Sequence, residues 1–308
     1  MWDLRKEIRN LGKKLVMGII ILFLLVMGTL SIRSAGRSAD TGSGAGKGKV
    51  GVIQIKGALT ETGSESILSA TGSDAEKIME EIRKAAKRDD IKALVLRINS
   101  PGGTSVAAQE VGIELDRFRK TGKPVVTSMG DVCASGGYWV ACSSDRIIAN
   151  PSTLTGSIGV IMEFSNLEGL YGKIGIREEV IKSGAYKDIG SSTRQLTADE
   201  RVMLQNLVND SYSQFLDQVT RGRKGKMTRE EVTNIADGRI ISGRQGKELG
   251  LVDDLGNYYD ALAIARKMAH LENDSEVEVL NKPGIWETLV ADVSAQRLLP
   301  QQGWQLRY

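Results

Sequence analysis

The sequence predicts an α/β protein whose strands pair largely in parallel. From about residue 49 to residue 282, short apolar segments rich in β-branched residues alternate with amphipathic segments of helical period. Parallel neighbours need long crossover connections, and the helical segments supply them. The chain has 308 residues, 41% hydrophobic and 26% charged, which is enough for one large domain or two small ones and too apolar for a disordered chain.

Each predicted element follows from its own pattern. Strands are predicted where the sequence is apolar or alternates with period two, at 50–55, 93–98, 124–128, 146–149, 158–164, 179–181 and 277–280. Helices are predicted at 73–88, 105–119, 136–143, 167–173, 197–221, 229–235, 244–249 and 258–270. Two of these helices open with a capping-box pattern, Ser73 to Glu76 and Thr197 to Glu200.

Residues 15–32 form an uncharged apolar run, and we expect it to be a transmembrane anchor. At 1.5 Å per residue it spans roughly 27 Å, close to the thickness of a hydrocarbon core. A soluble helix of this length should show a polar face, and a cleaved signal peptide usually has a shorter run. More basic side chains precede the run than follow it, which predicts a cytoplasmic N-terminus and an extracytoplasmic body in the cell membrane.

The chain therefore divides into five predicted parts. They are a basic cytoplasmic N-terminus (1–14), the anchor (15–32), a flexible Gly/Ser-rich linker (33–48), a folded domain (49–282) and a tail without a strong pattern (283–308). The net charge of +3 splits into +5 for residues 1–48 and −2 for the rest, so the basic character belongs to the N-terminal part. With only 5% aromatic residues, a base-stacking surface is disfavoured, and we expect no nucleic-acid partner.

Counts of cysteine and histidine limit the chemistry. Cys133, Cys142 and the single histidine, His270, cannot make a four-ligand zinc site, and we expect no metal. The two cysteines are expected to be buried and unpaired. The basic stretch 221–226 is expected to be a solvated loop, with contact to anionic lipid headgroups as the alternative.

Two glycine-containing turns are candidates for catalysis. Ser135 opens a predicted helix and is followed by Gly136, so it is either an ordinary N-cap or a nucleophile beside helix-start N–H groups. Cys133 replaces the first glycine of a Gly-x-Ser-x-Gly elbow, which disfavours an α/β-hydrolase. Gly102 follows an apolar strand, in a β-turn or as an oxyanion-hole donor, and one such donor contributes about 3–4 kcal/mol.

The identity of a base is open from composition alone. His270 ends a predicted helix, where a cation suits the helix dipole, and a structural role is favoured. A lysine can act as the base instead, if burial lowers the pKa of its amine to about 7–8. Lys187 stands among small and aromatic neighbours, although spacing does not select it over other lysines. Ser157 could hold such an amine or could belong to a polar turn.

Four motifs occur in a fixed order along the folded domain: Asn99–Gly103 (NSPGG), Ala134–Tyr138 (ASGGY), Thr155–Gly159 (TGSIG) and Ser183–Asp188 (SGAYKD). Together with one N-terminal anchor, they resemble the short-form bacterial signal peptide peptidase A family, membrane-bound serine proteases of the S49 type. The resemblance covers about residues 49–280. It implies a crotonase-like fold, related to that of the Clp-type protease, and no cofactor.

The resemblance also implies a role for each motif. Ser135 would be the nucleophile and Lys187 the general base, with Ser157 orienting the lysine amine. The N–H groups of Gly102 and Gly136 would form the oxyanion hole. A Ser–Lys dyad needs no imidazole, which suits a chain with one histidine.

Partners follow from the same resemblance. The substrates would be remnant signal peptides and other hydrophobic peptides at the membrane. The chain would form a ring- or dome-shaped homo-oligomer whose subunits complete each other's sites, so that one subunit can leave Ser135 and Lys187 apart. The tail, 283–308, is either a flexible end or a peptide that reaches a protease site and is trimmed there.

Two other classes of function compete with this prediction. A crotonase-like enzyme acting on acyl-CoA would need a nucleotide-binding surface, and an extracytoplasmic body argues against it because CoA esters are cytosolic. In a non-catalytic membrane scaffold, Ser135 would be only a helix cap. Covalent labelling of Ser135 by a serine-reactive probe would exclude the scaffold.

Overall fold

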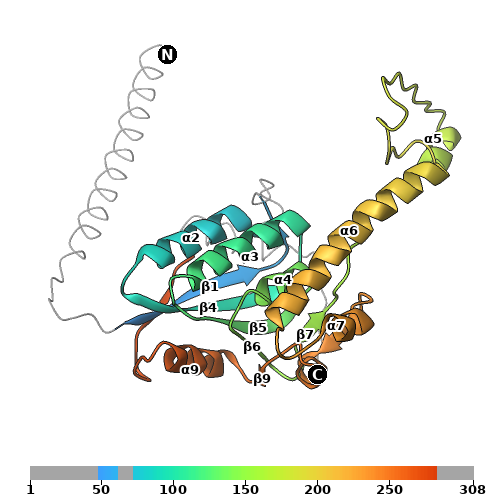
Figure 1. The fold of residues 1–308 in the computed structure, drawn as a ribbon. Helices are drawn as coiled ribbons and strands as arrows, with labels where there is room; N and C mark the ends of the chain where they lie inside the picture. Colours follow the sequence, from blue (N-terminus) through green and yellow to red (C-terminus); the bar gives the residue numbers. More distant parts are fainter. Residues whose placement is uncertain (1–47, 62–71, 283–308) are drawn as a thin grey trace, which may run out of the picture. The chain divides into compact units, whose positions relative to one another are not determined.

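The computed structural model describes residues 48–61 and 72–282, and most of its strands belong to one eight-stranded sheet (Figure 1). The strand order is β10-β1-β4-β5-β6-β9, with β7 paired to β5 and β8 paired to β7. The bounds are β1 (Lys49–Lys56), β4 (Ile91–Ser100), β5 (Val125–Ala134), β6 (Arg146–Ala149), β7 (Leu154–Gly156), β8 (Ile240–Ser242), β9 (Asp254–Leu255) and β10 (Val277–Val279). A separate short pair joins β2 (Leu59–Thr60) to β3 (Ser73–Asp74). All these pairs are parallel except β7 with β8, which confirms the predicted mixed α/β fold.

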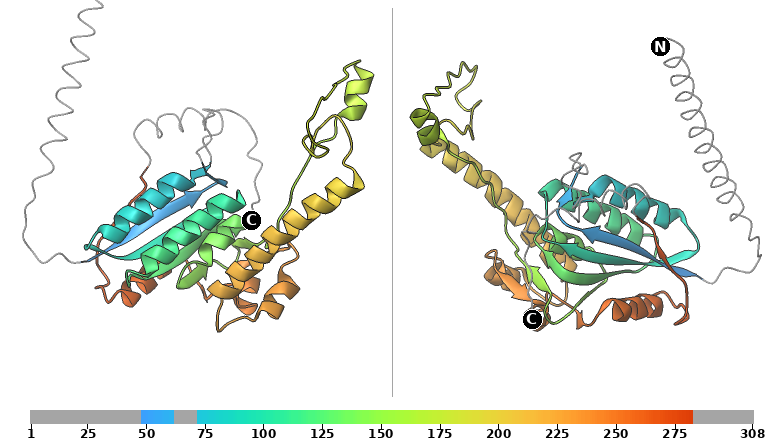
Figure 2. Two further views of the ribbon diagram at one scale, coloured as in Figure 1. Left: turned by 45° about the horizontal axis from the view of Figure 1, so that its top comes forward. Right: turned by 180° about the vertical axis from the view of Figure 1, so that it is seen from behind.

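Helices cover both faces of the sheet (Figures 1 and 2). Those described are α2 (Ala75–Lys87), α3 (Ser105–Arg119), α4 (Gly136–Ala141), α5 (Glu168–Lys173), α6 (Ala198–Gly222), α7 (Arg229–Ile235), α8 (Gly243–Glu248) and α9 (Tyr258–Met268). Because side chains alternate along a strand, Ile53 and Ile55 of β1 join the apolar cluster under α2 and α3. Val50 and Val52 of the same strand pack on the other face, against α9.

Helix α6 is packed at one end and exposed at the other. Its first turn is fixed by the predicted capping box between Thr197 and Glu200, which the structure confirms. Phe215 and Val219, near its other end, lie in the core. Figures 1 and 2 show its first half extending away from the sheet, with α5 and the segment 160–197 at the far end.

Three sequence predictions are wrong. The predicted strand 158–164 is absent because β7 ends at Gly156, and Ser157 turns the chain with a φ of 50°. The predicted strand 179–181 is irregular and exposed, since its β-forming residues have no neighbouring strand to pair with. Helix α2 is capped by Asp74, whereas the Ser73 hydroxyl donates to the Lys56 carbonyl.

The predicted N-terminus (1–14), the anchor (15–32), nearly all of the linker (33–48) and the tail (283–308) lie outside the described residues. Among the helices that the structure does describe, none combines the length and the apolar character that crossing a bilayer requires.

Candidate active site

Three neighbouring strands end at one edge of the sheet, and the candidate residues follow them. In the register of β4 and β5, Ser100 pairs with Cys133, and in that of β5 and β7, Ala134 pairs with Gly156. The turns that carry Gly102, Ser135 and Ser157 therefore leave the sheet side by side. The carboxyl edge of parallel strands is where α/β proteins usually bind ligands.

Ser135 occupies the N-cap position of α4 without acting as a cap. Its φ and ψ are 52° and −124°, and its side chain makes no capping hydrogen bond. Its amide donates to the Gly156 carbonyl at 2.9 Å, and its carbonyl accepts from the Trp139 amide at 2.9 Å. A backbone this unusual costs of order 1–3 kcal/mol and is typical of functional sites. The hydroxyl is thus left free of the structural role that the sequence alone allowed.

Gly102 packs directly against this serine, and Gly136 packs against the turn that carries Gly102. A Cβ built on Gly102 would lie 2.8 Å from the Ser135 Cβ and 3.1 Å from its Oγ, and the φ of Gly102 is +121°. A Cβ on Gly136 would lie 3.3 Å from the Gly103 nitrogen. Any larger residue at position 102 would therefore displace the serine side chain.

The two predicted oxyanion donors differ in their partners. The Gly102 N–H donates to the Ser100 Oγ at 3.2 Å, and the Ser100 hydroxyl donates to the Gly102 carbonyl at 3.1 Å. The Gly136 N–H, at the first position of α4, has no acceptor among the described residues. Ser100 was not singled out from the sequence, although a serine two residues before a turn glycine is a known turn-closing pattern.

Ser157 lies next to Ser135 through the backbone. It follows Gly156, whose carbonyl accepts the Ser135 amide, and its own amide donates to the Arg239 carbonyl at 2.8 Å. Ser157 is half-buried and follows the last residue of β7, with a positive φ of 50°.

Lys187 is not joined to this group in the single chain. It is exposed, in a turn between α5 and α6, and no hydrogen bond links it to Ser135. Helix α4 contacts the opposite end of α6, where Gln218 donates to the Trp139 carbonyl at 3.2 Å. About twenty residues of helix, roughly 30 Å, lie between Gln218 and the first turn of α6. The structure therefore brings Gly102, Ser135, Gly136 and Ser157 together and leaves Lys187 apart.

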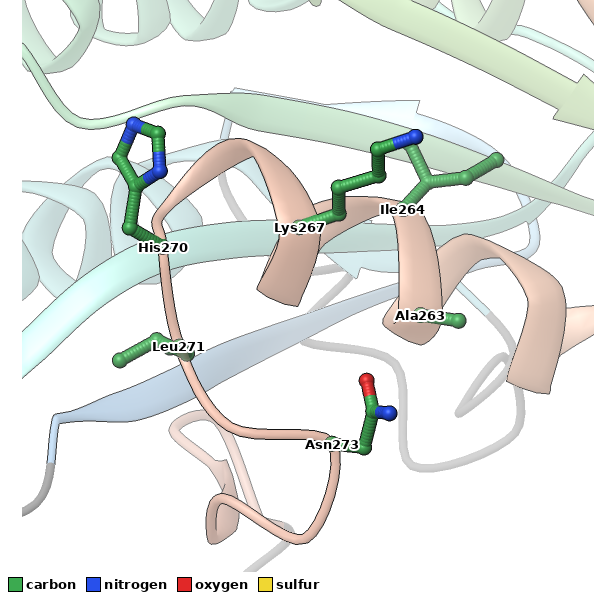
Figure 3. Close-up of a pocket in the computed structure, with 6 residues that line it drawn as sticks. All are labelled: Ala263, Ile264, Lys267, His270, Leu271 and Asn273. Carbon is green, nitrogen blue, oxygen red and sulfur yellow. The ribbon is translucent and has the colours of Figure 1, made fainter.

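His270 follows the end of α9, the helix that covers the opposite face of the sheet from α2 and α3 (Figure 1). Its φ is 54°, and its amide donates to the Lys267 carbonyl at 3.3 Å, as at many helix C-termini. Figure 3 shows the shallow hollow that it lines with Ala263, Ile264, Lys267, Leu271 and Asn273. The structure thus supports the helix-end role that the sequence favoured.

Both cysteines are free and buried, which confirms the sequence prediction. Burial raises the pKa of the Cys133 thiol, and it raises the pKa of Cys142 to about 12. Cys133 donates to the Gly137 carbonyl at 3.4 Å. The thiol nearest to Ser135 is therefore held protonated and does not compete with the hydroxyl as a nucleophile.

A buried ion pair, Arg223 with Asp253, lies near the Tyr138 side chain of α4. The Arg223 guanidinium donates to both carboxylate oxygens of Asp253, at 2.7 and 3.1 Å, and the Tyr138 hydroxyl of α4 donates to the nearby Leu251 carbonyl at 2.8 Å. Within the basic stretch 221–226, Lys226 also contacts Asp253, and Arg221 pairs with Asp116 at 3.2 Å. Arg223 is buried, whereas Arg221, Lys224, Gly225 and Lys226 are exposed at the end of α6 and in the turn after it, which agrees with the predicted solvated loop. Contact of this stretch with anionic lipid headgroups stays the alternative.

Comparison with known proteins shows which family this chain belongs to. The model of Peptidase family S49 matches residues 117–272, which include Ser135, Ser157 and Lys187. A protein named as a protease of Synechocystis sp. is 44% identical over 236 residues, or 76% of this chain and 80% of that protein. A protein named as the signal peptide peptidase SppA of Enterococcus faecium is 33% identical over 77% of this chain and 69% of its own length. Protease 4 of Salmonella typhi is 38% identical over 76% of this chain, which spans only 36% of that protein. The chain belongs to peptidase family S49.

Proposed function

We propose that this protein is a membrane-anchored serine endopeptidase of crotonase-like fold, which cleaves peptides through an acyl-enzyme on Ser135. The observation that carries the proposal is the free Ser135 hydroxyl on a strained backbone, packed against Gly102 at the carboxyl edge of the sheet. A serine that only capped α4 would use its hydroxyl for the cap. Here the hydroxyl makes no hydrogen bond to another described residue.

The chemistry follows from the groups around this hydroxyl. The Ser135 Oγ attacks the substrate carbonyl while an uncharged Lys187 amine takes its proton. The negative oxygen that develops is held by the Gly136 N–H and by the Gly102 N–H, which exchanges Ser100 for the oxyanion. The lysine then returns the proton to the leaving amine of the substrate. In the second step, the Lys187 amine activates the water that releases the acyl group from Ser135.

We propose that Lys187 serves the Ser135 of a neighbouring subunit. Most of the large apolar side chains that the described residues expose lie between 161 and 207, and their exposure reaches 82% at Ile161 and 99% at Ile181. An exposed apolar surface of this kind usually marks an interface. A second copy of the chain packed on α6 and the segment before it would cover this surface. It would also exclude water from the amine, as a neutral lysine requires.

The proposed substrates are remnant signal peptides and other hydrophobic peptides at the cytoplasmic membrane. This proposal is supported by the relative named SppA and by the apolar run 15–32, which would hold the protease domain at the extracytoplasmic face. Membership in a peptidase family argues against an acyl-CoA enzyme and against a scaffold.

The test uses three variants of the full-length protein in detergent micelles. We expect Ser135→Ala and Lys187→Ala to lower kcat for a hydrophobic peptide by at least about 10⁴-fold, because members of a catalytic dyad act as a unit. His270→Ala should keep most of the activity. A serine-reactive probe, located by mass spectrometry, should label Ser135 in the wild type and label it far more slowly in Lys187→Ala. Full activity in Lys187→Ala would refute the proposed base.

A further inference from the structure

The proposed base stands on a turn with little structure of its own. The amide of Lys187 donates to the Gly184 carbonyl at 3.2 Å, and the amide of Ile189 donates to the Tyr186 carbonyl at 3.1 Å. These residues belong to neither a helix nor a strand. Local turn bonds alone hold a backbone loosely, so a catalytic amine at this place needs support from another element.

Asp188, next to the proposed base, supplies the first part of that support. Its Oδ1 accepts from the Lys182 amine at 2.7 Å and from the Arg194 Nη2 at 2.8 Å, and its Oδ2 accepts from the Arg194 Nε at 2.9 Å. Hydrogen bonds from Arg194 and then Lys182 hold the pKa of this carboxyl well below its usual range. Both carboxylate oxygens are thus engaged by cations other than Lys187.

Arg194 carries the connection from this turn to α6. Its Nη1 and Nη2 donate to the two carboxylate oxygens of Glu200, at 2.8 and 2.5 Å. Glu200 is only 2% exposed, and it accepts the Thr197 amide at 2.8 Å in the capping box that opens α6. The planar guanidinium therefore binds one carboxylate on each side, a geometry that lysine cannot reproduce.

The same ion pairs also neutralise the negative charge of Asp188, the residue next to the proposed base. Lys182, Asp188, Arg194 and Glu200 carry two positive and two negative charges in contact with one another. No ion pair joins Asp188 to Lys187 among the described residues. A free carboxylate at position 188 would pair with the adjacent amine and favour its charged form, which cannot act as a base.

We propose that Arg194 is a positioning residue for proteolysis, which fixes the Lys187 turn on the first turn of α6 by bridging Asp188 to Glu200. This inference rests on the proposed role of Lys187 as the base. Because the first half of α6 exposes apolar residues for the proposed subunit contact, Arg194 would make the position of the amine depend on the position of that helix. A displacement of a catalytic group by about 1 Å lowers a rate by about 100-fold.

The experiment measures kcat, KM and assembly of the full-length protein in detergent for Arg194→Gln, Asp188→Asn and the double variant. We expect kcat about 100-fold lower in each, with KM within about threefold of the wild type and the same sedimentation behaviour. The double variant should lose no more than either single variant, because all three break one bridge. Arg229→Gln is the matched control, since Arg229 also pairs with α6, through Asp217, but away from the proposed base. It should keep wild-type kcat.

Each outcome decides between the two proposals. Wild-type kcat in Arg194→Gln, with an inactive Lys187→Ala, would overturn the role of Arg194 and leave the dyad intact. An active Lys187→Ala would instead overturn the proposed function itself. A raised KM at unchanged kcat, or additive losses in the double variant, would also contradict the bridge. If Arg194→Gln fails to assemble, Asp188→Asn decides alone, because it leaves the pair between Arg194 and Glu200 in place.

Discussion

At the scale of single residues, positive φ values separate the candidate site from the rest of the fold. Among the described residues, Ser135, Ser157 and His270 are the non-glycine residues with positive φ. His270 follows a helix, where this conformation is ordinary. Ser135 has a ψ of −124°, outside the left-handed helical region, and it lies beside Ser157 through Gly156. The strain is therefore concentrated where the nucleophile is proposed.

Gly102 gives a residue-scale prediction with a matched control. Gly102→Ala should lower kcat by at least about 100-fold, because the new Cβ would displace both the Ser135 side chain and the Gly136 N–H. Gly122 also has a positive φ, +82°, but a Cβ there would meet nothing within 4 Å. Gly122→Ala should cost about 1 kcal/mol in the free energy of unfolding and leave kcat unchanged.

Peptide cleavage and urea unfolding of both alanine variants separate the two effects. Equal losses of activity at positions 102 and 122 would mean that backbone strain, and not the approach to Ser135, explains the result.

At the scale of elements, the sequence predicted what is encoded locally. The capping box at Thr197 and the turns after β4 and β5 were predicted because cap residues and glycines act over a few positions. The prediction of a strand at 158–164 was wrong because β7 ends at Gly156 and Ser157, with a positive φ, turns the chain out of the sheet. The bridge made by Arg194 gave no signal, since its partners are defined only by the fold. The separation of Lys187 from Ser135 within one chain was expected from the family resemblance alone, because it depends on the length of α6 and not on the residues of the motifs.

The buried ion pair between Arg223 and Asp253 gives a prediction at this scale. Burial by itself would raise the pKa of Asp253, but hydrogen bonds from Arg223 and Lys226 outweigh it and lower the pKa to about 2. Asp253→Asn would leave the fully buried Arg223 without a counter-charge, so we expect the free energy of unfolding to fall by about 3–5 kcal/mol at pH 7. Urea unfolding monitored by circular dichroism measures this loss.

The pH dependence of that loss provides the check. Because the folded-state pKa of Asp253 is lowered, its charge stabilises the fold above about pH 4, and this stabilisation disappears as the pH falls toward 2. The difference between wild type and Asp253→Asn should therefore shrink over this range. A difference that stays constant from pH 7 to pH 2 would show that the charge of Asp253 is not its cause.

At the scale of the whole molecule, one chain holds each half of the proposed dyad at a different place. Ser135 lies at the edge of the sheet, and the turn that carries Lys187 lies by the exposed end of α6 (Figure 1). The intervening helix is fixed at its packed end by Phe215 and by the hydrogen bonds of Gln218. To bring Lys187 to the Ser135 of its own chain, the first half of α6 would have to bend back toward the sheet, which would break backbone hydrogen bonds of the helix. A neighbouring subunit can present its lysine without any such change.

Mixing two inactive variants tests this arrangement directly. Ser135→Ala subunits keep the lysine and Lys187→Ala subunits keep the serine, so a shared site is complete wherever the serine of one kind meets the lysine of the other. After dissociation and reassembly of an equal mixture of full-length chains, random assembly into a ring should restore about a quarter of wild-type activity. Each variant reassembled alone should stay inactive, and mixing without dissociation serves as the control. A reassembled mixture with no activity, despite mixed oligomers detected by mass spectrometry, would mean that each site takes both residues from one chain.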